Sequence, residues 1–134
     1  MLRSYALTDI GRKRQLNQDY IYLTENPVGN LPNLFIVADG MGGHKAGDYA
    51  SDLAVETVVK EAGASLETSP SRILGHAITI ANRILRQRAS ENFALSGMGT
   101  TLVAATCIGR FLEVANVGDS RLYVIGDEIV QITE

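Results

Sequence analysis

The sequence has few of the features that mark secreted, membrane or metal-finger proteins. Its single cysteine, Cys107, cannot form an internal disulfide, and no CxxC motif or Cys/His cluster is present. No apolar stretch approaches the roughly 18 residues that suggest a membrane span. The segment Met1–Asp9 lacks the basic region and long apolar run of a secretory signal peptide. We therefore expect a protein of a reducing, cytoplasmic environment with no membrane contact.

Charge and composition exclude further classes. Twelve Lys and Arg against fifteen Asp and Glu give a net charge of -3, so the basic surplus typical of general nucleic-acid binding is absent. Apolar residues make up 46% of the chain, which is too many for a disordered protein. Thirteen Gly and three Pro are too few for a collagen-like or linker-dominated chain. A length of 134 residues suits one globular domain.

Hydrophobic periodicity predicts strands followed by two helices. Residues 4–10 and 20–24 read as strands, and the apolar run 34–38 is typical of a strand buried on both faces. Apolar residues at helical spacing predict one helix over 46–62. A second helix is expected to begin at Ser69-Pro70, where serine can cap free N–H groups and proline tolerates the first turn. Its arginines, which lie mostly off the apolar stripe, are interpreted as a solvated face: Arg83, Arg86 and Arg88.

The remainder of the chain predicts strands again, separated by turn signals that contain glycine. The expected strands are 100–108, 111–117, 121–125 and 129–132. The expected hairpin turns are Gly109-Arg110, Gly118-Asp119 and Gly126-Asp127. Strands before and after a helical pair, with consecutive hairpins, indicate an α+β fold with antiparallel sheets.

The segment Asp39-Gly-Met-Gly-Gly-His44 lies between a predicted strand and a predicted helix, where phosphate-binding loops are often found. It fails both common nucleotide patterns, because Lys45 stands where a dinucleotide loop needs glycine and Ala46 follows where a Walker loop needs serine or threonine. A carboxylate at a strand end fits Mg²⁺ or Mn²⁺ better. The plain alternative is an Asp-Gly turn.

Two further segments have the same ambiguity when each is taken alone. Gly118-Asp119-Ser120 is either a hairpin turn or another carboxylate ligand. Arg14 precedes the polar turn Asn17-Gln18-Asp19, and an arginine can bind a phosphate with two parallel hydrogen bonds. The alternative for Arg14 is an exposed basic residue.

Taken together, these segments resemble one family. The matching motifs, in order, are Arg14-Gln-Leu-Asn-Gln-Asp19, Val37-Ala-Asp-Gly-Met-Gly-Gly-His44, Gly97-Met-Gly-Thr-Thr101 and Val117-Gly-Asp-Ser-Arg121. Their order and spacing are similar to those of the metal-dependent, type 2C protein phosphatases, and most similar to the bacterial branch. The resemblance implies an αββα sandwich of two mostly antiparallel sheets flanked by helices.

The resemblance also implies two core Mn²⁺ or Mg²⁺ ions and a weakly held third. Asp39 would bridge the core ions and the Gly40 carbonyl would bind one of them, while Asp119 would belong to the third. Asp19 and Gln18 would act mainly through metal-bound water.

Arg14 would hold the substrate phosphate in such a site. A metal-activated water would attack phosphorus directly, while the cations and Arg14 offset charge on the phosphoryl oxygens. This chemistry needs no protein nucleophile, which agrees with the interpretation of Cys107 as a buried small hydrophobe. The implied substrates are phosphoserine and phosphothreonine in proteins, and the implied functional opponent is a eukaryotic-like serine/threonine kinase.

The sequence departs from the family pattern at its end. Residues 130–134 look like the strand that leads into the family's Asp-His pair, and the remaining metal carboxylates of the family come from later segments. We therefore expect residues 1–134 to form the N-terminal part of one truncated catalytic domain. Two alternatives stay open: an inactive interaction module with the phosphatase fold, and a nucleotide-binding protein that uses the loop Gly40–Gly43.

Overall fold

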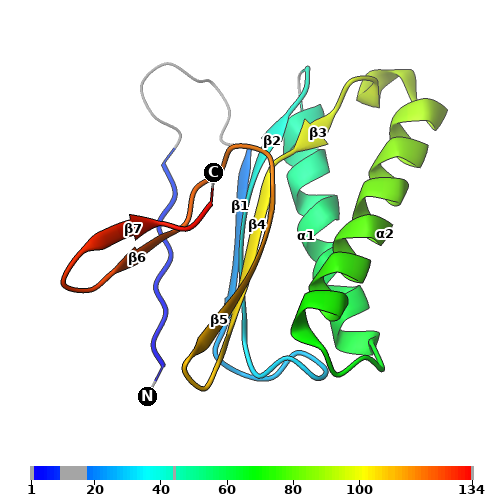
Figure 1. The fold of residues 1–134 in the computed structure, drawn as a ribbon. Coiled ribbons are helices and arrows are strands. Elements are labelled where there is room, and N and C mark those ends of the chain that lie inside the picture. The colour runs from blue at the N-terminus through cyan, green and yellow to red at the C-terminus, as the bar shows by residue number, and fades with distance from the viewer. Residues whose placement is uncertain (1, 10–17, 44, 134) are drawn as a thin grey trace.

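The computed structural model describes residues 2–9, 18–43 and 45–133. In this part of the chain, an antiparallel sheet with the order β1-β2-β4-β5 is covered on one face by two helices, and a separate hairpin lies on the other side (Figure 1). The elements are β1 (Asp19–Thr24), β2 (Leu34–Met41), α1 (Ala46–Ala64), α2 (Pro70–Glu91), the 3₁₀ turn η1 (Phe93–Leu95), β3 (Gly99–Thr100), β4 (Leu102–Ile108), β5 (Phe111–Val117), β6 (Tyr123–Ile125) and β7 (Ile129–Gln131). The α+β prediction is confirmed.

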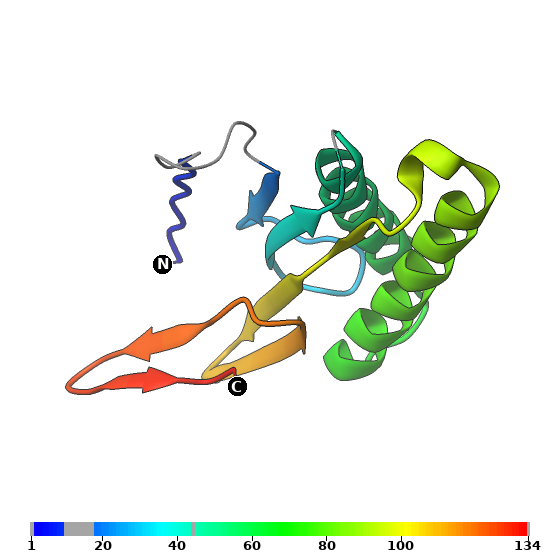
Figure 2. The same cartoon turned by 90° about the horizontal axis from the view of Figure 1, so that it is seen from above.

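The central strand β2 has one buried face and one open face. Leu34, Ile36 and Ala38 point towards the helices and are fully buried. Val37, on the other face, is 44% exposed. The prediction that this strand is buried on both faces is therefore wrong for the described part of the chain. The reason is visible from above, because α1 and α2 lie on one side of the sheet while β6 and β7 extend away from the other (Figure 2).

The two helices follow the apolar pattern closely. Residues of α2 at helical spacing are fully or nearly fully buried: Ile73, Leu74, Ala77, Ala81 and Leu85. They pack on α1, whose buried residues include Ala54 and Val58. Helix α1 covers β2, and α2 also contacts β5. Pro70 occupies the first turn of α2 as predicted. Ser69 occupies the N-cap position as predicted, but its side chain makes no capping hydrogen bond, and its Oγ lies 3.4 Å from that of Ser71.

Three local predictions need correction. Residues 4–9 form no strand. Gly118-Asp119 does not close a hairpin, because β5 pairs with β4 and β6 pairs with β7. Cys107 is half-buried rather than buried, and its backbone N–H donates to Asn33 Oδ1 at 2.7 Å. Among the described residues, no helix is long and apolar enough to cross a membrane.

Candidate metal and phosphate site

Two carboxylates face each other at one end of the sheet. The antiparallel register of β1 and β2 places Asp19 directly opposite Asp39, and both residues are half-buried. Directly opposed residues project from the same face with Cβ atoms about 5 Å apart. Like charges in this position destabilise a strand pair. Carboxylate oxygens are the ligands that Mg²⁺ and Mn²⁺ prefer, so this end of the sheet is the candidate place for the metal site expected from the sequence.

Asp19 and Asp39 line one cavity on the sheet face that points away from the helices. The cavity has a volume of about 480 Å³. Its apolar wall consists of Phe35, Val37, Val103, Ala105 and Leu122, and its polar rim adds Ser120, Arg121 and Tyr123 to the two carboxylates. The pKa of Arg121 is raised above its ordinary value, first by a hydrogen bond with Tyr123 and to a smaller extent by the charge of Asp119. The rim therefore carries two carboxylates and one guanidinium group.

The residue before Asp19 is fixed to β2 and to α1. The Gln18 carbonyl accepts hydrogen bonds from the Gly40 N–H at 3.0 Å and from the Ser51 hydroxyl at 2.7 Å. Two glycines permit this approach. A Cβ atom on Gly40 would lie 1.8 Å from the Gly47 carbonyl oxygen, and one on Gly47 would lie 2.6 Å from the Gln18 side chain. The first turn of α1 thus holds the start of β1 in register with the end of β2.

Asp39 is held from its other side by Thr101. The Thr101 N–H donates to the Asp39 carbonyl at 2.9 Å, and the Asp39 N–H donates to Thr101 Oγ1 at 3.1 Å. Thr101 Oγ1 also lies 2.6 Å from Ser120 Oγ. This chain of contacts joins the Asp39 backbone to the loop that carries Asp119. The close approach requires glycine at 118, which has φ +94° and whose added Cβ would lie 2.7 Å from Thr101 Cγ2.

The structure brings several of the predicted site residues to one end of the sheet. Asp19 and Asp39 face each other, and the Gly40 N–H donates to the Gln18 carbonyl. Asp119 is exposed and lies in the loop that Ser120 joins to Thr101. Arg14 lies outside the described residues. Among the residues described, no group of three or more His, Cys, Asp or Glu could hold a metal ion. The individual roles assigned to these residues stay predictions.

The sequence interpretation missed the residues that hold the carboxylates in place. From the sequence, no role at the site was assigned to Thr101, Ser51, Gly47 or Ser120. Small residues at positions where two backbones meet are a usable signal, because a Cβ or a longer side chain would not fit there. The partners are far apart in the chain, however, with Asp39 and Thr101 separated by 62 positions.

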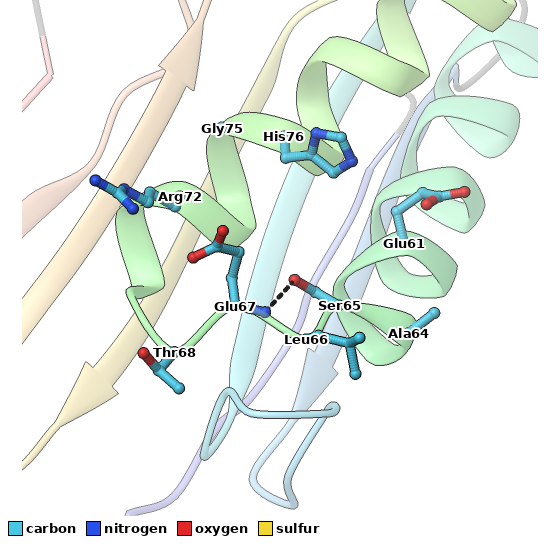
Figure 3. A pocket seen from close by; sticks show the side chains of 9 residues that line it. All are labelled: Glu61, Ala64, Ser65, Leu66, Glu67, Thr68, Arg72, Gly75 and His76. Carbon is cyan, nitrogen blue, oxygen red and sulfur yellow. Dashed lines mark hydrogen bonds between the residues drawn. The ribbon is translucent and has the colours of Figure 1, made fainter.

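A larger hollow lies at the opposite end of the helical pair. It has a volume of about 770 Å³ and is formed where α1 ends and α2 begins (Figure 3). Its charged lining residues are Glu61, Glu67, Arg72 and His76. The hydrogen bond drawn there runs from the Glu67 N–H to Ser65 Oγ at 3.2 Å. None of the motif residues lines this hollow, so size alone does not identify the functional site.

Known proteins resemble the whole described fold. The sequence pattern of the family described as Protein phosphatase 2C matches residues 10–133. A serine/threonine phosphatase stp of Listeria monocytogenes is 42% identical over 132 residues, which is 95% of this chain and 52% of that protein. The crystal structure of serine/threonine phosphatase Stp1 from Staphylococcus aureus superposes with a TM-score of 0.82 at 36% identity, covering 95% of this chain and 51% of that one.

The fold also resembles a solved structure that contains metal ions. The catalytic domain of serine threonine protein phosphatase PstP, solved in complex with two manganese ions, gives a TM-score of 0.78 at 33% identity and covers 92% of this chain and 51% of that one. The chain therefore spans about half the length of the curated relatives it matches. The pattern match over most of the sequence, the identity to named relatives and the shared fold lead to one assignment: the chain belongs to the protein phosphatase 2C family.

Proposed function

We propose that this chain supplies the N-terminal share of a metal-dependent site that hydrolyses phosphoserine and phosphothreonine in proteins. The observation that carries the proposal is the direct opposition of Asp19 and Asp39 on the rim of one cavity. A polar, half-buried carboxylate pair is a poor stabiliser of a sheet edge and a good ligand for a hard cation. The family assignment supports hydrolysis of a phosphoester as the chemistry that such a cation would serve.

The ions proposed are Mn²⁺ or Mg²⁺, two in the core of the site and possibly a third. The fit is chemical, because such ions take oxygen ligands and usually keep several waters beside one or two carboxylates. Asp39 would bridge the core ions with help from the Gly40 carbonyl, and Asp119 would serve the third. Asp19 and Gln18 would hold the waters around them. Bound divalent ions lower the pKa of water and neutralise charge on phosphoryl oxygens.

The contribution of the chain's own residues is positioning. Thr101 donates to the Asp39 carbonyl and accepts from the Asp39 N–H. Both backbone polar groups of Asp39 are therefore fixed, and its carboxylate is presented without further ordering of the strand. The Gln18 carbonyl, held by Gly40 and Ser51, does the same for the start of β1. Arg14 is proposed to orient the substrate phosphate through its fork of N–H donors.

The proposed substrates require a supplier. Phosphoserine and phosphothreonine in proteins are made by serine/threonine kinases, so the functional opponent proposed for this phosphatase is a kinase of that class. We also propose the cytoplasm as its compartment, in keeping with the free, half-buried thiol of Cys107.

The test is hydrolysis of a small phosphomonoester in the presence of Mn²⁺, before and after chelation. Because the chain spans about half the length of its relatives, we would assay it alone and as part of the longest product of its reading frame. Asp39→Asn should lower the metal-dependent rate by about 100-fold or more, because ligand loss exceeds the 10–100-fold effect typical of supporting residues. Asp127→Asn makes the same charge change in the exposed β6–β7 turn and should leave the rate unchanged.

Two results would overturn the proposal. One is the absence of metal-dependent hydrolysis in both forms of the protein, which would favour an inactive binding module with this fold. The other is an Asp39→Asn variant that hydrolyses the ester as fast as Asp127→Asn.

A further inference from the structure

Another cleft lies at the end of the sheet that carries Asp39, on the helix-covered side. It has a volume of about 460 Å³ and is formed by the last turns of α2 and the loop that leads into β3. Leu85 and Met98 supply apolar lining, while Asn82, Arg86 and Ser96 supply polar groups. The loop turns sharply at Gly97, which has φ +77°. The cleft therefore combines an apolar floor with a small number of hydrogen-bonding groups, as ligand sites commonly do.

The two helices carry opposite charge. α1 contains four carboxylates and one lysine, whereas α2 contains four arginines and one carboxylate. That carboxylate, Glu91, accepts a hydrogen bond from Gln87 at 3.1 Å. A face that only needs to be solvated usually mixes both signs, whereas α2 places basic residues on the outside of a protein whose net charge is -3.

The arginines of α2 divide into two groups. Arg72, Arg83 and Arg86 are exposed and lie within an arc of about 60° on the helix, opposite its buried stripe. Arg88 points elsewhere and donates to the Tyr49 hydroxyl at 2.6 Å. Arg86 lines the cleft, and Arg83 precedes it by about one turn. The positive charge is therefore concentrated at the cleft end of the helix.

The cleft is close to the carboxylate pair. Thr100 lines it and is paired with Gly40, the residue that follows Asp39. Paired residues of antiparallel strands have Cα atoms about 5 Å apart, and an extended chain advances about 3.3 Å per residue. Asp39 projects from the other face of the sheet, so a polypeptide would cross the end of the β2–β3 pair to reach both places. A few residues are enough for that path.

An exposed aromatic residue stands at the same corner. Phe93, in the turn that follows α2, is 94% exposed. One exposed apolar residue alone carries no meaning. Aromatic side chains and arginine together are nevertheless the residues enriched in protein-binding surfaces. Because Phe93 closely follows the helix that carries these arginines, the surface favours a polypeptide partner over a small ion.

We propose that the Arg86 cleft binds an acidic side chain of the protein substrate, a few residues away from the phosphorylated one. Arg86 would hold the carboxylate through two parallel N–H donors, and Asn82 and Ser96 would supply further donors. Arg83 adds positive charge next to the cleft. The proposal rests on the proposed phosphatase function and names its substrate class as phosphoproteins with Asp or Glu near the phosphorylated residue.

The cleft can be tested without catalysis. The probe is a fluorescein-labelled, glutamate-rich peptide that carries no phosphate, and its glutamine counterpart is the neutral control. Arg86→Gln should weaken binding of the acidic peptide by about fivefold, the effect of losing one well-placed charge pair. Arg72→Gln, which removes the same charge from the far end of the same helix face, should weaken it less than about twofold. Equal effects of the two variants, or equal binding of both peptides, would overturn the proposal.

Kinetics separate this proposal from the function on which it rests. Arg86→Gln should lower kcat/KM about fivefold for a phosphopeptide with glutamate beside the phosphoserine, and should leave a glutamine-flanked phosphopeptide and a small phosphomonoester unchanged. A uniform loss on all three substrates would contradict a role in recognition. If the wild-type protein hydrolyses none of them, the phosphatase function fails, while the peptide-binding experiment still decides whether the cleft recognises acidic segments.

Discussion

The two faces of the central sheet are built for different purposes. On the helix-covered face, β2 presents Leu34, Ile36 and Ala38, all fully buried. On the other face the same strand presents Val37, which is 44% exposed, and half-buried Asp39. The first face supplies burial and therefore stability, because removing apolar area from water is the main stabilising term in folding. In the described part of the chain, the second face forms the cavity that Asp19 and Asp39 line.

This division depends on the register of a single strand. Side chains alternate between faces with a period of two, so a slip by one residue would move Asp39 into the helix-facing core and Ile36 to the cavity side. The contacts of Thr101 and Gln18 with β2 prevent such a slip. The residues that position the carboxylates thus also maintain the difference between the faces.

The largest expected effect on stability comes from the helix-covered face. Ile36→Ala should lower the free energy of unfolding by about 3 kcal/mol, because the buried site loses apolar contacts and gains a cavity. Val37→Ala, on the neighbouring and partly exposed position, should cost less than about 1 kcal/mol. Chemical denaturation of the two variants measures the difference. Equal losses would show that both faces contribute alike to the core.

The next largest loss of stability is expected at the close approach of Gly40 in β2 to Gly47 in α1. Gly40→Ala should destabilise the protein by about 2–3 kcal/mol, because its Cβ would lie 1.8 Å from the Gly47 carbonyl oxygen and the helix would have to move. Gly43→Ala is the matched control, since an added Cβ there meets nothing within 4 Å. Thermal unfolding of the two variants measures the difference in their stability. A Gly40→Ala protein as stable as the control would contradict the packing described.

A substitution on the open face of the sheet should cost less stability than the two changes above. Thr101→Val keeps the shape of the side chain but removes the acceptor of the Asp39 N–H, which should cost about 1–2 kcal/mol. It should also lower Mn²⁺ affinity about tenfold, as the loss of a supporting residue does. Thr100→Val removes a neighbouring hydroxyl that bonds to the Thr101 carbonyl and serves as the control. Unchanged Mn²⁺ affinity in Thr101→Val would remove its positioning role.

The smallest effect is expected at the outer surface of α1. The pKa of Glu56 is raised, first by the negative charge of Asp52, then by their hydrogen bond and by partial desolvation. The folded protein therefore loses stability relative to the unfolded chain as pH rises through the pKa of Glu56. Glu56→Gln should raise the melting temperature by about 1 °C at pH 7 and leave it unchanged near pH 3. Glu61→Gln is the control. The residue four positions before Glu61 is the uncharged Thr57, so this substitution should not raise the melting temperature.

Local patterns predicted the helix-covered face well. Helix α2 begins where the Ser69-Pro70 signal predicted, and β5 occupies the expected residues 111–117, because each pattern is set by neighbours in the chain. The ends of elements were less accurate. β2 continues to Met41, beyond the expected end at Ala38, because pairing with β3 extends it.

The geometry of the open face could not be predicted in the same way. The opposition of Asp19 and Asp39 follows from strand register, and the hydrogen bonds from Thr101 join residues 62 positions apart. The exposure of Val37 depends on what covers the sheet, which an apolar run does not reveal. The residue types at the site were identified from motifs, whereas their mutual placement required the fold.

Whether Asp39 binds a metal ion is tested most directly by a calorimetric titration of the protein with Mn²⁺. We predict saturable binding in the wild type and in Asp127→Asn, and its loss in Asp39→Asn, because Asp39 faces Asp19 on the cavity rim. The variants differ in charge from the wild type by the same amount, so a general electrostatic effect would appear in both. Absence of saturable binding in the wild type, or retention of full affinity in Asp39→Asn, would contradict a metal site at Asp39.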